Sequence, residues 1–169
     1  MRFEHIQNVN VSAVFSPDRK FRYRLTVEKP GAHAGKTVCV IMQNPSVANE
    51  DQADKSVQFL EKLVFEKNCY SELQGCSKLV IVNQYAHIQT NDFDGTDDLI
   101  GTDNDAHIKK ALDESDIIVI AWGSANGYAG RQKHILGMIG KKPGKPVYKS
   151  KAHPSRAGYG DFLIPFDAE

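Results

Sequence analysis

Three continuous runs of β-branched and aliphatic residues constrain the fold of this chain more than any other feature. They are TVCVIM at 37–42, KLVIVN at 78–83 and DIIVIAW at 116–122. Runs without polar alternation are typical of parallel strands covered on both faces. Apolar residues at helical spacing lie between and after them, around 57–64, 103–113 and 129–139. With KPVYKS at 145–150 as a fourth strand, this alternation predicts an α/β fold, a three-layer α/β/α arrangement around a four-stranded parallel central sheet.

The segment ahead of these runs predicts an N-terminal β-hairpin. VSAVF at 11–15 and FRYRLTV at 21–27 flank the turn sequence SPDRK. In the second run, apolar residues alternate with Arg22, Arg24 and Thr26, the period-2 pattern of a strand with one exposed face. We expect the hairpin at the edge of the sheet, and all of 1–169 in a single domain, since 169 residues suit one core better than two.

The charge balance argues against a general attraction to nucleic acid or membrane. The 21 basic and 21 acidic residues cancel, so a phosphate-bearing partner must be met by a local patch. No apolar run approaches the roughly 20 residues that a membrane helix needs, and the first ten residues lack the apolar core of a signal peptide. We expect a cytoplasmic protein with no membrane partner and with reduced cysteines.

Polar residues follow each predicted parallel strand. In chain order the strands lead into Asn44-Pro45-Ser46, Asn83, Trp122-Gly123-Ser124 and His153-Pro154-Ser155. Ligands of open parallel sheets bind outside the carboxyl ends of the strands, so one shared site is expected there. Each motif taken alone also fits an ordinary turn or helix cap, and that alternative stays open.

The order of these motifs resembles the uracil-DNA glycosylase superfamily. QNPS, a strand ending in Asn, VIAWGSA and HPSRAGYGDF stand where that superfamily has its water-activating motif, Leu-Leu-Asn strand, Leu-Trp-Gly strand and terminal His-Pro-Ser-Pro-Leu loop. Residues 38–139 resemble more closely an uncharacterised bacterial and phage family, a domain of unknown function. Its motifs here are Asn-Pro-Ser, Val-Asn, Ala-Trp-Gly and an Asp two residues before Ser, Asp54 and Ser56.

The glycosylase resemblance implies hydrolytic release of a damaged or modified nucleobase from nucleic acid or a nucleotide. Asn44 and His153 match the water-positioning residue and the donor to the leaving base, and are the candidate catalytic residues. Asn83 matches the reader of the base edge, since an amide offers a donor beside an acceptor. The other candidate substrate-binding residues are Pro45, Ser46, Trp122, Gly123 and Ser155, and the aromatic candidates for stacking on the base are Phe59, Tyr85 and Trp122.

Three positions depart from the superfamily. Asn44 replaces the Asp of its most active branch, and an amide cannot act as a base. Ser46 replaces the Tyr that excludes thymine, and Arg156-Ala157-Gly158 replaces the Pro-Leu-Ser that carries the apolar wedge into a duplex. A non-catalytic nucleotide- or nucleobase-binding protein therefore remains the alternative to an N-glycosylase.

Charge is unevenly distributed along the chain. Residues 117–160 contain eight basic residues and no acid, whereas 92–116 contains nine acids and two bases. This polarity predicts a side that faces the phosphates of a nucleic acid or nucleotide, with Lys149, Lys151 and Arg156 as the candidate phosphate-binding residues. A solvated lysine loop is the alternative for Lys141, Lys142 and Lys145.

The acidic stretch leaves a metal-dependent hydrolase open as a third class. Hard cations prefer carboxylate ligands, and the stretch offers Asp92, Asp94, Asp97 and Asp98. Their spacing matches no calcium loop, so we expect no metal and no other cofactor.

Overall fold

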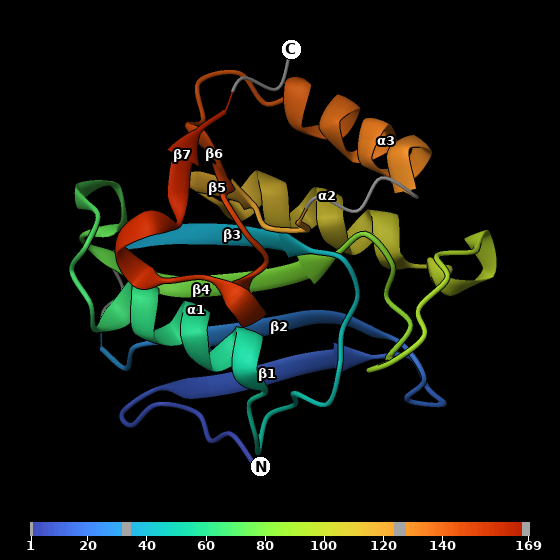
Figure 1. Cartoon of the computed structure of the whole chain (residues 1–169), viewed down its shortest axis with the longest axis horizontal. Coiled ribbons are helices and arrows are strands. Elements are labelled where there is room, and N and C mark those ends of the chain that lie inside the picture. Colours follow the sequence, from blue (N-terminus) through green and yellow to red (C-terminus); the bar gives the residue numbers. More distant parts are fainter. Residues whose placement is uncertain (1, 32–34, 124–127, 167–169) are drawn as a thin grey trace.

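The computed structural model describes residues 2–31, 35–123 and 128–166, and within them a seven-stranded sheet carries helices on both faces (Figure 1). The strands are β1 (Asn10–Phe15), β2 (Arg22–Glu28), β3 (Lys36–Met42), β4 (Cys76–Asn83), β5 (Ile117–Ile120), β6 (Val147–Ser150) and β7 (Leu163–Pro165), and the helices are α1 (Lys55–Phe65), α2 (Asn104–Glu114) and α3 (Ala129–Gly140). None of the described helices is both long and apolar enough to cross a membrane.

The strand order is β1-β2-β4-β3-β5-β6-β7. The pairings within β4-β3-β5-β6 are parallel, and those of β1 with β2, β2 with β4, and β6 with β7 are antiparallel. The expected four-stranded parallel central sheet is therefore wrong, because the sheet is mixed and has seven strands. The N-terminal hairpin is part of this sheet, since β2 pairs along β4 from Leu25 with Ile81 to Glu28 with Lys78.

Strand β2 is buried on both faces, which corrects the expected exposed face of this strand, whereas β1 at the edge of the sheet alternates between exposed and partly buried residues. Arg22 is 1% exposed and Thr26 is buried. Arg24 pairs with Glu114 at the end of α2, at 2.7 Å. The alternation in the sequence thus marks polar side chains that are covered by other parts of the chain.

The sheet divides the core into two apolar clusters, one on each of its faces, and helices cover both clusters. Along β3, Val38 and Val40 pack in the cluster under α1, whereas Cys39 and Ile41 pack in the cluster under α2 and α3. Successive side chains of a strand point to opposite faces, so a strand covered on both sides must be apolar throughout. This explains why the run at 37–42 has no polar alternation.

The C-terminal segment folds back against α1 and is fixed there by aromatic residues (Figure 1). Phe59 of α1 stacks on Tyr159 with ring centroids 4.6 Å apart. The Tyr70 hydroxyl accepts hydrogen bonds from the backbone N–H groups of Phe162 and Leu163, at 2.8 and 3.2 Å. These contacts hold the 3₁₀ turn Pro154–Arg156 beside the start of α1.

Candidate functional site

A pocket of about 540 Å³ lies beyond the carboxyl ends of β3 and β5, and we call it the inner pocket. It brings together most of the residues predicted from the strand ends: Asn44, Pro45, Ser46, Trp122, Gly123, His153, Ser155 and Arg156. Asn83, Lys149 and Lys151 are not among its lining residues. The predicted Ser124 lies outside the described residues.

Asn44 joins the loop after β3 to the loop after β4. Its Nδ2 donates to the carbonyl of Gln89 at 2.7 Å and to that of Pro45 at 3.2 Å. Ser46 Oγ and Thr90 Oγ1 are 2.8 Å apart, and Gln89 N donates to Pro45 O at 2.9 Å. Within the described residues Asn44 Oδ1 accepts one long hydrogen bond, from Gln43 at 3.3 Å, so it keeps the capacity to accept a hydrogen bond from a bound water.

His153 is held with one ring nitrogen fixed as an acceptor. The backbone N–H of Ser155 donates to Nδ1 at 3.2 Å, and Ser155 Oγ lies 2.9 Å from the same atom. The proton of the neutral ring is therefore on Nε2, which remains a donor. Burial lowers the pKa of His153, the charge of Arg156 lowers it further, and Asp54 opposes the shift weakly, so the ring is neutral at pH 7.

Gly123 forms the wall next to His153. Its φ is +78°, a conformation that other residues seldom adopt, and a Cβ there would lie 3.7 Å from the Cβ of His153. A glycine at the end of the Ala-Trp-Gly motif thus meets a backbone requirement of the loop after β5.

Asp54 is a pocket residue to which the sequence assigned no role. Its Oδ1 accepts from the backbone N–H of Val57 at 2.9 Å and caps α1. It is the only carboxylate among the described residues that line the inner pocket, and its Oδ2 has no hydrogen-bond partner in the described part of the chain. The Asp-x-Ser spacing at 54–56 was the available signal, but a helix cap explains an Asp equally well.

Arg22, predicted to face solvent, lines the same pocket from β2. Its Nη1 donates to the carbonyl of Ala48 at 2.8 Å, whereas Nε and Nη2 have no partner among the described residues. Burial lowers the pKa of Arg22 to about 10, and the nearby charge of Asp54 opposes this shift. No sequence signal singled out this arginine, because its alternation with apolar residues indicates an exposed face.

The predicted base reader is close to the pocket but does not form its wall. Asn83 is 1% exposed, it pairs in register with Met42, which lines the pocket, and both polar atoms of its side chain lack a partner within the described ranges. Of the aromatic candidates, only Trp122 lines the pocket. Phe59 stacks on Tyr159, and Tyr85 packs against Phe93 and Tyr128.

Most cations of the acid-free stretch have partners elsewhere. Lys151 pairs with Asp161 at 2.7 Å, and the ammonium of Lys149 lies 5.6 Å from the centre of the Phe166 ring. Three further cations bond to acids or carbonyls: Arg131 to Asp105, Lys142 to Asp113, and Lys145 to the carbonyls of Leu112 and Asp113. Of the three predicted phosphate-binding residues, only Arg156 lines the inner pocket.

The acidic stretch does not form a metal site in the described part of the chain. No group of three or more His, Cys, Asp or Glu side chains there is arranged to hold a metal ion. Asp105 of this region is instead bound to Arg131 and His134, at 2.5 and 3.0 Å. The metal-dependent alternative therefore has no structural support among these residues.

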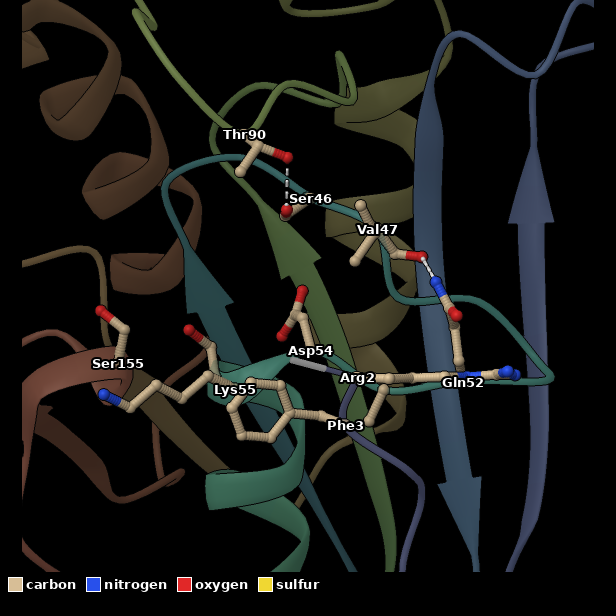
Figure 2. Close-up of a pocket in the computed structure, with 11 residues that line it drawn as sticks. Arg2, Phe3, Ser46, Val47, Gln52, Asp54, Lys55, Thr90 and Ser155 are labelled. Atoms are coloured by element: carbon tan, nitrogen blue, oxygen red, sulfur yellow. Dashed lines mark hydrogen bonds between the residues drawn. The ribbon is translucent and has the colours of Figure 1, made fainter.

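Figure 2 shows a second cavity, the outer pocket, whose volume is about 700 Å³ and which adjoins the inner pocket. The two share the lining residues Ser46, Asp54, Ser56, Thr90 and Ser155. Figure 2 shows the Asp54 carboxylate pointing toward Ser46 and the Lys55 side chain extending toward Ser155. Arg2 and Phe3 close the other side. Together the two pockets form one groove past the start of α1.

Comparison with known proteins gives a family without an assigned activity. No curated protein and no solved structure matches the chain. Nothing in these comparisons links it to the uracil-DNA glycosylase superfamily, so the resemblance to that superfamily rests on its short motifs alone. The model of a family described as a protein of unknown function, DUF1643, matches residues 22–156, and the chain therefore belongs to the DUF1643 family.

Proposed function

We propose that the inner pocket binds a nucleotide or nucleoside and releases its nucleobase by hydrolysis. The observation that carries this proposal is that a carboxylate, an orienting amide and a neutral imidazole donor, Asp54, Asn44 and His153, line one pocket. Cleavage of an N-glycosidic bond needs groups that position and activate a water and a donor for the leaving base, and these three side chains can supply both.

In the proposed reaction, Asp54 is the general base and Asn44 keeps its predicted role of orienting the water. The Asp54 carboxylate takes a proton from a water that Asn44 Oδ1 orients, and the water oxygen forms a bond to the anomeric carbon of the sugar. The C–N bond breaks, and its electron pair leaves with the base. Solvent then protonates the base, so the products are a free base and a sugar hemiacetal.

The role of His153 follows from its tautomer. With Nδ1 accepting from the backbone of Ser155, Nε2–H can donate to an oxygen of the leaving base as negative charge develops there. Trp122 is the aromatic residue of the pocket wall on which the base can stack. A volume of about 540 Å³ lies within the range of small-ligand pockets.

The test is release of free base, measured by chromatography, from nucleosides, nucleotides and oligonucleotides carrying uracil, hypoxanthine, xanthine or modified pyrimidines. Asp54→Asn removes the general base, the carboxylate, but retains the α1 cap, because Asn caps helices as well as Asp does. His153→Ala removes the donor. Each variant should lower the rate by about a hundredfold to a thousandfold without loss of folding.

The matched control is Asp161→Asn, which neutralises an exposed carboxylate outside both pockets and should leave the rate unchanged. Base release that survives both Asp54→Asn and His153→Ala would contradict the proposed roles. Asn44→Ala is a poorer probe, because it also removes the bonds that join the loops after β3 and β4.

A non-catalytic binder is the second candidate, and the bonding of Asn44 favours it. Its Nδ2 is fully used in fixing the loops, so Asn44 can act as a rigid wall without taking part in a reaction. Tight binding of a nucleotide without any free base in the same assay would support this candidate over the hydrolase.

A further inference from the structure

The proposed reaction gives no role to Arg22, the most deeply buried cation of the inner pocket. No carboxylate of the described residues lies within ion-pair distance of it, and a single backbone carbonyl, that of Ala48, accepts from it. A buried charge without a counter-ion costs several kcal/mol. An anion that enters the pocket would remove this cost, and so would bind more tightly than a neutral ligand of the same shape.

The unpartnered atoms of Arg22 have the geometry of an oxyanion receptor. Nε and Nη2 lie on the same edge of the planar guanidinium, and both lack a partner, whereas Nη1 on the other edge is bonded to Ala48. Such an edge donates two parallel hydrogen bonds to two oxygens of one phosphate or carboxylate. Arg22 is thereby held at one edge, and the buried atoms of its other edge have no hydrogen-bond partner among the described residues.

The rest of the groove is also electropositive. Arg156 lines the inner pocket, and Arg2 and Lys55 line the outer one. No ion pair is formed by any of the three within the described part of the chain, and Asp54 is the only carboxylate lining either pocket. A group with more than one negative charge suits four cations and one carboxylate better than a singly charged carboxylate does.

We propose that Arg22 is the phosphate receptor of the groove and that the ligand is a nucleoside monophosphate. This deepens the proposed function by naming its substrate class and rests on that function for the nucleoside part alone. The phosphate receptor itself rests on Arg22 and the groove. Phosphate and carboxylate share the two-oxygen geometry that the guanidinium edge recognises, so the experiment separates them.

The test is isothermal titration of the full-length protein with 5′-monophosphates of the common nucleosides, the matching nucleosides, inorganic phosphate and acetate. Arg22→Met removes the charge at similar volume. Arg22→Lys keeps the charge but lacks the guanidinium edge that can donate a bidentate pair of hydrogen bonds. Arg24→Met is the matched control, because Arg24 is in the same strand and pairs with Glu114 outside both pockets.

The unmodified protein should bind a monophosphate at least about tenfold more tightly than its nucleoside, since a buried charge-assisted pair is worth this much or more. Arg22→Met should abolish that difference, Arg22→Lys should reduce it, and Arg24→Met should preserve it. Circular dichroism and thermal unfolding verify that each variant is folded; if Arg22→Met does not fold, Arg22→Lys decides by the same criterion.

Equal binding of monophosphate and nucleoside, an advantage that persists in Arg22→Met, or no binding of any phosphate probe would overturn the receptor. Binding of acetate as tight as that of inorganic phosphate would overturn the choice of phosphate. Free base is measured separately: Arg22-dependent binding without base release would refute only the hydrolysis. Base release from a nucleoside monophosphate with an unchanged KM in Arg22→Met would refute only the receptor.

Discussion

Two groups of cations in this molecule differ in what surrounds them. Residues 117–160 contain no acid. Three of their cations nevertheless pair with an Asp outside this range: Arg131 with Asp105, Lys142 with Asp113 and Lys151 with Asp161. In the groove, Arg22 and Arg156 are far apart in sequence, and neither has an ion-pair partner in the described residues. Three basic residues of the run are thus neutralised by acids, whereas Arg156 of the same run and the distant Arg22 have no ion-pair partner among the described residues.

The difference shows that charge along a sequence and charge at a surface are separate quantities. Asp105 and Asp113 belong to the acidic stretch, and the fold places them against α3 and the segment after it. The polarity between 92–116 and 117–160 is therefore partly cancelled by ion pairs between the two stretches. A cation that remains unpaired after folding is the better indicator of an anionic ligand.

Replacing a paired and an unpaired arginine by Met should give the largest difference, measured as the free energy of unfolding. Arg131→Met removes bonds to Asp105 and to the carbonyl of Gln84, and should lower the free energy of unfolding by about 1.5–3 kcal/mol. Arg22→Met removes a buried charge without a counter-ion together with its hydrogen bond to Ala48, two effects of opposite sign, so the free energy of unfolding should fall by no more than about 1 kcal/mol. Urea unfolding measures both. A larger loss in Arg22→Met than in Arg131→Met would invert the comparison.

The pH dependence of base release gives the next largest effect. His153 must be neutral to keep its Nδ1 acceptor, and burial together with Arg156 holds its pKa below the ordinary value. The rate should therefore stay level as the pH falls to about 6.5 and decline by up to tenfold per pH unit only below the lowered pKa. Arg156→Met should move this acidic limb to higher pH. A limb that is centred at 6.5 or above in the unmodified protein would contradict the neutral-donor role.

The smallest effect is expected at Lys149, which lies outside both pockets. Lys149→Met should change the affinity for a nucleoside monophosphate by less than about twofold, because screened surface charges contribute little. Arg156→Met is the paired variant and should weaken binding more. If the two variants weaken binding equally, the cations of the 117–160 stretch act together, and the distinction between the two groups is lost.

The sequence predicted the elements that have a strong local signal. The three β-branched runs form β3, β4 and β5, the segment KPVYKS at 145–150 contains β6, and α1 begins directly after its cap Asp54. The three residues of β7 have no such signal, because Leu163–Pro165 is too short for a period and forms a strand only by pairing with β6. The mixed character of the sheet depends on that pairing and on β2 joining β4, and both are long-range contacts.

The sequence allowed us to predict which residues would line the candidate pocket where a strand end is followed by a proline, as at Asn44 and His153. Asn83 also lies at a strand end, but it is buried. Its burial was not predicted, because the strand register that aligns it with Met42 is not visible in the sequence. Arg22 was missed because its position in the pocket depends on β2 lying inside the sheet. Asp54 was missed because one residue serves as both helix cap and pocket carboxylate.

The most direct measurement is the side-chain Nε–H spectrum of the arginines by NMR during titration with a nucleoside monophosphate. Both Arg22 and Arg131 are buried, and they differ in that Arg131 Nε already donates to the carbonyl of Gln84, whereas Arg22 Nε has no described partner. If the groove receives a phosphate at Arg22, the Arg22 resonance shifts with the monophosphate and hardly moves with the nucleoside, and the Arg131 resonance stays in place. An unchanged Arg22 resonance at saturating ligand, or equal shifts of both arginines, would contradict the distinction between unpaired and neutralised cations.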